Sequence, residues 1–290
     1  MEELTLLILG AGWTSTFLIP LLQSHKIPFA ATTTTGHPVA SVPTIPFKFD
    51  PSLAAPETRA SIAALPRARY ILVTFPLTGT ESSAQLITTY NSTHPSSTSP
   101  TRFIQLGSTG IWQTPPNSPA QTSPWIDRHS PITSPTPRFL AETQLLVRGG
   151  CVLNLAGLWG GTRLPRNWAA RVAPTKEALG GKGSLHLVHG LDVARAVVAL
   201  VQGGEEMWAR AGKGQRWMVT DGWVYDWWGL VAGWADGEDG EKERAGWVFE
   251  LMREAGVRAL PRGMEELGRC YDAREFWETV GIVPVKGRVA

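Results

Sequence analysis

Short apolar runs alternate with segments of helical spacing along most of the chain. Residues 4–9 are apolar and stop at a glycine, as buried parallel strands do. Similar runs predict further strands at residues 27–33, 47–50, 70–75, 103–106, 151–156, 186–189 and 217–220, the last of which closes the sheet. Apolar positions three and four apart predict helices at residues 16–24, 60–65, 81–90, 139–147 and 191–201. The alternation predicts an α/β fold with a doubly wound parallel sheet, a Rossmann fold.

The chain is long enough for a large core with a smaller lobe. We expect residues 1–160 to form a dinucleotide-binding core, to which residues 185–222 return. Residues 161–184 and 223–290 then form a smaller C-terminal substrate-binding lobe. Ten of the 13 tryptophans follow residue 150. They either pack this part of the chain or line a cleft for a planar ligand, and packing is the commoner role of such clusters.

Composition excludes several classes of protein. The chain has 290 residues, of which 43% are hydrophobic and 18% charged, as in a packed globular protein. A net charge of +2 is too small for a nucleic-acid footprint, and no apolar run reaches the ~20 residues of a membrane helix. Cys151 and Cys270 form no disulfide or zinc pattern, and no metal motif is present. The acidic start Met1-Glu2-Glu3 argues against a signal peptide, so we expect a cytoplasmic location.

The strongest motif is Gly10-Ala11-Gly12-Trp13-Thr14-Ser15, between the first strand and the first helix. Gly10 permits a tight turn, and Gly12 lets the backbone approach a pyrophosphate. The amides at the start of the helix favour phosphate oxygens. Ser15 stands where a third glycine is usual and is small enough for close packing of helix on strand. These residues predict a site for a nicotinamide dinucleotide.

The end of the second strand favours NADP, although NAD stays open. NAD sites normally place an acid there to hold the ribose 2′-hydroxyl, whereas this chain has Thr33, Thr34 and Thr35. A 2′-phosphate is compatible with hydroxyls but not with a carboxylate. Asp50 either contacts the adenine or forms a turn. We expect four further residues at strand ends to contact the cofactor: Phe75, Pro76, Leu106 and Gly107.

Four segments, in order along residues 4–222, resemble the extended and atypical short-chain dehydrogenase/reductases, including NAD-dependent epimerase/dehydratase-like proteins. The first is the glycine turn. The second, Leu106-Gly107-Ser108-Thr109-Gly110-Ile111-Trp112, is similar to the family's stretch after strand five. The others are Asn154-Leu155-Ala156-Gly157-Leu158-Trp159-Gly160 and Leu187-Val188-His189-Gly190-Leu191-Asp192-Val193-Ala194-Arg195-Ala196. The resemblance implies a Rossmann fold, a nicotinamide cofactor and a small-molecule substrate.

The same resemblance implies a catalytic serine, tyrosine and lysine. Ser108 matches the serine, and Thr109 beside it is a second hydroxyl for a substrate carbonyl. Counting back from Glu142, which matches a family glutamate, places Ser134 at the tyrosine and Arg138 at the lysine. A serine hydroxyl cannot replace a phenol as the acid, and arginine does not titrate as lysine does. The usual Tyr-x-x-x-Lys pair is therefore lost.

Other polar residues suggest weaker alternatives. His129, with Asp127 and Arg128, lies in a loop after strand five and either replaces the lost proton donor or belongs to a solvated charge cluster. We expect Asp192 to cap the helix that begins at Val193.

Two functions remain open after this comparison. The first is an atypical NADP-dependent oxidoreductase or epimerase-like enzyme that acts on a small organic substrate. The second is a non-catalytic NAD(P)-binding sensor or regulatory protein, which would keep the glycine turn while losing the catalytic pair. The sequence names no substrate and no oligomeric state.

Overall fold

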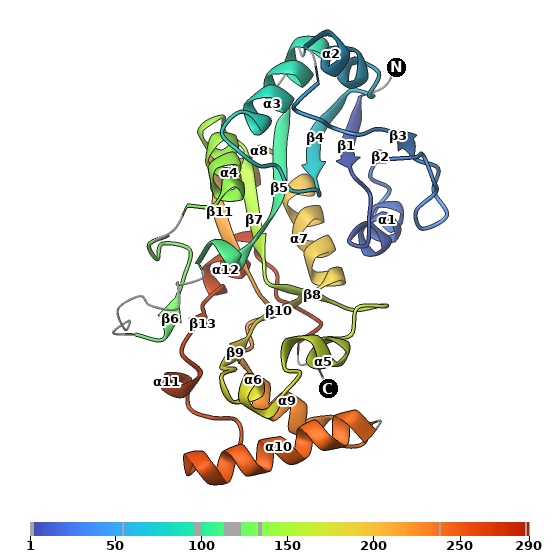
Figure 1. Cartoon of the computed structure of the whole chain (residues 1–290). Helices are drawn as coiled ribbons and strands as arrows, with labels where there is room; N and C mark the ends of the chain where they lie inside the picture. Colours follow the sequence, from blue (N-terminus) through green and yellow to red (C-terminus); the bar gives the residue numbers. More distant parts are fainter. Residues whose placement is uncertain are drawn as a thin grey trace.

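A computed structural model describes residues 3–53, 55–95, 100–112, 123–132, 135–237, 239–287 and 289. Its centre is a seven-stranded parallel sheet in the order β11-β7-β5-β4-β1-β2-β3 (Figure 1). The strands are β1 Leu4–Leu9, β2 Phe29–Thr33, β3 Ile45–Pro46, β4 Ala68–Val73, β5 Arg102–Ser108, β7 Cys151–Leu155 and β11 Arg216–Val219. The doubly wound Rossmann fold is confirmed, and the last predicted strand does lie at the edge of the sheet.

Successive residues of the strands serve opposite faces of the sheet. Leu6 and Ile8 of β1 point into one apolar cluster, whereas Leu7 and Leu9 point into another. The first cluster is completed by α1 Ser15–Ser24, α7 Gly190–Gln202 and α12 Arg274–Val280. The second is completed by α2 Ala55–Ala63, α3 Ser82–Thr93 and α4 Pro137–Val147. Burial on both faces explains why β1 is apolar throughout.

A third apolar cluster lies beyond the carboxyl ends of the central strands, in the lower half of Figure 1. Trp227, Trp228 and Trp234 are buried in it, and Trp168 and Trp247 pack against it.

One further helix is long, α10 Asp239–Ala255. The remaining elements are short: η1 Thr109–Trp112, β6 Trp125–Ile126, β8 Gly157–Trp159, η2 Pro165–Trp168, α5 Ala169–Val172, α6 Lys176–Gly180, β9 Ser184–Leu185, β10 Leu187–His189, α8 Gly204–Met207, η3 Trp208–Gly212, β12 Tyr225–Asp226, α9 Trp227–Gly233, α11 Met264–Leu267 and β13 Cys270–Tyr271.

Most of the late tryptophans are packing residues, as favoured above. Besides the three in the third cluster, Trp208, Trp217 and Trp277 are buried in the first cluster. Trp223 is the exception among the ten, because it is 48% exposed.

In the part of the chain that is described, no helix has both the length and the apolar character needed to cross a bilayer.

Three local predictions need correction. The third strand is Ile45–Pro46, not residues 47–50, because the backbone pairs with β2 two residues earlier in the chain than predicted. Helix α4 begins at Pro137, two residues earlier than predicted, because Thr136 caps it and proline suits the first helical position. His189 caps α7 in place of Asp192, whose carboxylate instead accepts from the amides of Val285 and Lys286.

Candidate cofactor and substrate site

The turn after β1 is shaped by one glycine and one threonine. Gly10 has φ +84°, and a Cβ there would lie 2.8 Å from the Phe75 ring, so glycine is required on both grounds. The Gly10 amide donates to the Thr32 hydroxyl at 3.0 Å, and the Ala11 amide donates to the Thr32 carbonyl at 2.6 Å. Thr32 therefore ties the turn to β2, a role that the threonine run in the sequence did not distinguish.

The following residues leave room and donors for an anion. The space beside Gly12 is open, since the nearest atom to a Cβ there would be the Gly10 carbonyl oxygen at 3.9 Å. Among the described residues, none accepts a hydrogen bond from the amides of Gly12, Trp13 or Thr14. Ser15 is fully buried at the start of α1, where a small side chain is needed. Free amides, open space and a helix start are what a pyrophosphate requires.

The end of β2 presents hydroxyls and a histidine. Thr33 is buried, and its hydroxyl lies 2.8 Å from that of Thr44. Thr34 and Thr35 are exposed, and the Thr35 hydroxyl lies 3.0 Å from Nδ1 of His37. Hydroxyls and an imidazole are compatible with a phosphate at this position.

The structure shows Asp50 in the turn-forming role. Its carboxylate accepts from the Ser52 amide at 2.9 Å and from the Ser52 hydroxyl at 2.6 Å. These hydrogen bonds lower the pKa of Asp50, the one from the Ser52 hydroxyl most. An adenine contact by the same side chain stays a prediction.

Of the residues at strand ends that were predicted to contact the cofactor, Phe75 lies beside the turn. Phe75 packs against Gly10 and stacks on Phe49 with ring centres 6.4 Å apart. Pro76 is exposed, whereas Leu106 is 8% exposed at the end of β5. Their contact with a cofactor stays a prediction.

A cavity of about 500 Å³ opens where β5 and β7 end. We call it the arginine pocket, because three of its described lining residues are arginines. Those lining residues are Gly107, Ser108, Arg138, Leu155, Ala156, Gly157, Leu158, Arg163, Trp168 and Arg171. The pocket thus lies at the carboxyl edge of a parallel sheet, where ligands of doubly wound folds bind.

The pocket floor is held by a buried polar network. Asn154 donates to the Ser108 carbonyl at 3.2 Å and to the Glu142 carboxylate at 2.9 Å. Arg216 forms an ion pair with the same carboxylate, which is 2% exposed. Burial raises the pKa of Glu142, although Asn154 and Arg216 act to lower it. A Cβ at Gly107 would overlap both Asn154 and Glu142, so this network fixes the backbone at the pocket floor.

The structure brings two of the predicted catalytic residues together. Ser108 and Arg138 both line the arginine pocket. The Ser108 hydroxyl accepts a hydrogen bond from the Gly110 amide at 3.2 Å, which leaves its proton available to a ligand. Thr109 is buried, and its carbonyl accepts from the Tyr271 hydroxyl at 3.1 Å. Ser134 lies outside the described residues.

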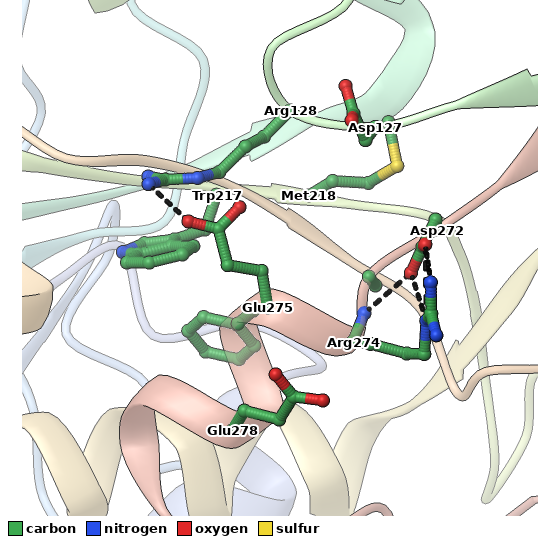
Figure 2. Close-up of a pocket in the computed structure, with 10 residues that line it drawn as sticks. Asp127, Arg128, Trp217, Met218, Asp272, Arg274, Glu275 and Glu278 are labelled. Atoms are coloured by element: carbon green, nitrogen blue, oxygen red, sulfur yellow. Dashed lines mark hydrogen bonds and ion pairs between the residues drawn. The ribbon is translucent and has the colours of Figure 1, made fainter.

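His129 is placed elsewhere. Its Nε2 lies 2.9 Å from the Glu275 carboxylate, and it is not among the residues that line the arginine pocket. Its neighbours Asp127 and Arg128 line a different cavity of about 230 Å³ beside α12, which we call the paired-charge pocket. Figure 2 shows the Arg128 guanidinium reaching the Glu275 carboxylate there. These contacts agree with the charge-cluster alternative for His129.

Both arginines of the paired-charge pocket are paired with a carboxylate of its lining. Arg128 and Glu275 are 2.6 Å apart, and Arg274 and Asp272 also 2.6 Å (Figure 2). The Arg128 guanidinium also stacks 3.9 Å from the centre of the Trp217 ring. Within the described ranges, no group of three or more His, Cys, Asp or Glu side chains is arranged to hold a metal ion.

No protein-family model and no curated protein sequence matches the chain. Solved structures match it over nearly the full length. One is a putative NAD-dependent epimerase/dehydratase from Methylobacillus flagellatus, 16% identical, with a TM-score of 0.61 and 98% of this chain and 94% of that one covered. RMD from Pseudomonas aeruginosa, complexed with NADPH, is 13% identical with a TM-score of 0.57, covering 99% and 95% of the two chains.

A third match is UDP-glucose 4-epimerase from Thermus thermophilus in complex with NAD. It is 13% identical with a TM-score of 0.57, and the match covers 98% of this chain and 94% of that one. At these identities the matches establish the fold. They confirm that the chain has the Rossmann fold of epimerase/dehydratase-like proteins, as the sequence resemblance implied.

Proposed function

We propose that the chain binds a nicotinamide dinucleotide and acts as an atypical NADP-dependent oxidoreductase or epimerase-like enzyme on a small organic substrate. The proposal rests on the turn after β1, in which Gly10 is constrained to glycine and the space beside Gly12 is open. The amides of Gly12, Trp13 and Thr14 have no acceptor among the residues that the structure describes. Two of the structural neighbours are complexes with NADPH or NAD, which supports the proposal.

The arginine pocket supplies the place for the substrate in this proposal. A bound nicotinamide would supply redox chemistry at the carboxyl edge of the sheet. Ser108 would donate its hydroxyl proton in a hydrogen bond to a substrate oxygen, and the floor network would hold Ser108 in place. Arg163 and Arg171 come from residues 161–184, so we propose that this segment forms the substrate-binding lobe with residues 223–290, except for α12, which packs on the sheet. The cytoplasmic location stays a prediction.

The preference for NADP is part of the proposal. Thr34, Thr35 and His37 are exposed at the end of β2, where hydroxyl and imidazole groups suit a 2′-phosphate and an acid would suit NAD. Replacing Thr35→Asp should weaken NADPH binding by about tenfold or more, because a carboxylate would face the phosphate. Equal NADPH affinity in this variant would contradict the preference.

Titration of the chain with NADPH and NADH tests cofactor binding. Gly12→Asp places a carboxylate against the expected phosphates without a clash in the protein itself, and it should abolish measurable binding. Gly246→Asp adds the same side chain at a position of α10 with no atom within 4 Å, so it is the matched control and should bind normally. If the unaltered chain binds neither NADPH nor NADH, or if Gly12→Asp binds them normally, the proposal is wrong.

A second function has one observation in its favour. None of the described residues that line the arginine pocket is a tyrosine, lysine or histidine. A non-catalytic NAD(P) sensor would need no such proton donor. Oxidation of NADPH in the presence of a carbonyl library separates the two: turnover establishes the enzyme, and tight binding without turnover establishes the sensor.

A further inference from the structure

Three guanidinium groups from separate elements line the arginine pocket. Arg138 lies in the first turn of α4, Arg163 follows β8, and Arg171 lies in α5. No aspartate or glutamate is among the described residues of the lining. Three cations around one cavity raise its potential and attract an anion.

These arginines also differ from a neighbour in the same segment. Arg166 pairs with Glu241, its Nη2 lying 2.9 Å from the carboxylate. By contrast, the guanidinium groups of Arg138, Arg163 and Arg171 form no ion pair or hydrogen bond with any residue in the described ranges. Because the three groups face one cavity whose described lining holds no carboxylate, their hydrogen-bond donors are together available to a ligand of the opposite charge.

Arg163 connects this pocket to the glycine turn. Its guanidinium carbon lies 4.4 Å from the centre of the Trp13 ring, and that ring packs edge-on against Phe17 at 5.0 Å. A cation–π contact orients the guanidinium without neutralising its charge. Arg163 is therefore held where the cofactor turn and the pocket meet, with its hydrogen-bond donors free.

The rest of the lining is apolar. Leu155, Ala156 and Leu158 line one part of the cavity, and Trp168 adds a flat aromatic surface. Such a surface suits the carbon skeleton of a ligand, while the guanidinium forks suit carboxylate or phosphate oxygens.

We propose that the arginine pocket binds an anionic substrate, a small molecule whose carboxylate or phosphate is held by the three arginines and whose apolar body packs against Trp168. This rests on the proposed function, because it assigns a substrate class to the same site. It goes beyond that function by making the acid group of the substrate the feature that the protein recognises.

Calorimetric titration of the full chain, in a buffer with excess NADPH, with benzoate and with inorganic phosphate tests this assignment. We expect at least one probe to bind, and Arg138→Gln and Arg171→Gln each to weaken it by about tenfold or more, since each removes charged hydrogen bonds. Binding of benzoate identifies a carboxylate substrate, and binding of phosphate alone identifies a phosphorylated one.

Arg148→Gln is the matched control. Arg148 lies just after α4, is exposed, and bonds to Gln144 one turn earlier, so the variant removes the same charge from the opposite end of the helix. It should leave probe affinity unchanged. Failure of both probes to bind, or equal losses in Arg148→Gln and Arg171→Gln, would overturn the proposal.

Parallel titrations with NADPH separate this proposal from the proposed function. If the arginine variants weaken NADPH but not the anion probes, the arginines serve the cofactor and the substrate assignment is wrong. If the arginine variants weaken binding of the probes while the unaltered chain binds no NADPH, the assignment of an anionic ligand is supported and the cofactor proposal is wrong.

Discussion

The two pockets described above use arginine in opposite ways. In the paired-charge pocket, Arg128 is bonded to Glu275, to the Gln215 side chain and to the Arg216 carbonyl, and it stacks on Trp217 (Figure 2). In the arginine pocket, three guanidinium groups have no such partners among the described residues.

The difference separates charge that stabilises the fold from charge that is available to a ligand. A guanidinium that is ion-paired and hydrogen-bonded within the chain holds elements together, and removing it leaves its partners unbonded. A guanidinium without partners in the chain contributes little to the stability of the fold. Its removal should instead lower the affinity for a ligand.

The largest effect should come from Arg128→Ala. The variant loses an ion pair, two hydrogen bonds and the stacking on Trp217, and it should lower the free energy of unfolding by about 2–3 kcal/mol. Chemical denaturation measures this. Affinity for NADPH should not change. If Arg128→Ala lowers the free energy of unfolding no more than Arg148→Ala does, the two pockets do not differ in the way described.

Gly107→Ala tests the rigid floor of the arginine pocket. The added methyl group would overlap Asn154 and Glu142, both buried, so overpacking should cost about 1–3 kcal/mol of stability. Gly233→Ala in α9, with nothing within 4 Å of the new atom, should be neutral or stabilising. Denaturation curves that coincide for the two variants would show that the floor is not tightly packed.

Acid should weaken the ion pair between Arg128 and Glu275 in the paired-charge pocket. The hydrogen bond from Arg128, followed by that from His129, lowers the pKa of Glu275 in the folded chain below its usual 4.5. Its stabilising contribution is therefore present above about pH 4.5 and is lost as the pH falls through the folded-state value.

Because Glu275 is 47% exposed, solvent screening keeps this contribution below about 1 kcal/mol. The difference in unfolding free energy between the unaltered chain and Glu275→Gln should shrink on acidification. Glu278→Gln, on the same helix, is the charge-matched control. A difference that grows as the pH falls would mean that the pair does not stabilise the fold.

The smallest effect should come from the arginine pocket itself. Arg171→Gln should change the free energy of unfolding by no more than about 0.5 kcal/mol, because no described partner is lost. The same denaturation series measures it beside Arg128→Ala. A large destabilisation would place Arg171 among the residues that hold the fold.

Periodicity was sufficient for the central sheet and its helices, because strands buried on both faces must be apolar throughout. It failed at β3, where pairing with β2 uses Ile45 and Pro46 rather than the aromatic residues that follow. Periodicity also does not reveal which residue caps a helix. His189, not the more usual aspartate, caps α7.

The candidate site was predicted in part. The glycine turn, Ser108 and Arg138 follow from motifs, since motif residues are adjacent in the chain. Arg171 was missed because α5 reaches the pocket only through the packing of a distant segment, and no spacing in the sequence signals that. Thr32 was hidden among four consecutive threonines, of which the structure assigns this one to the turn.

A crystal structure grown with NADP tests the central claim most directly. We expect the pyrophosphate to accept hydrogen bonds from the amides of Gly12, Trp13 and Thr14, with the nicotinamide end beside Ser108. The nucleotide bound at another surface, or no bound nucleotide at saturating concentration, would contradict the account.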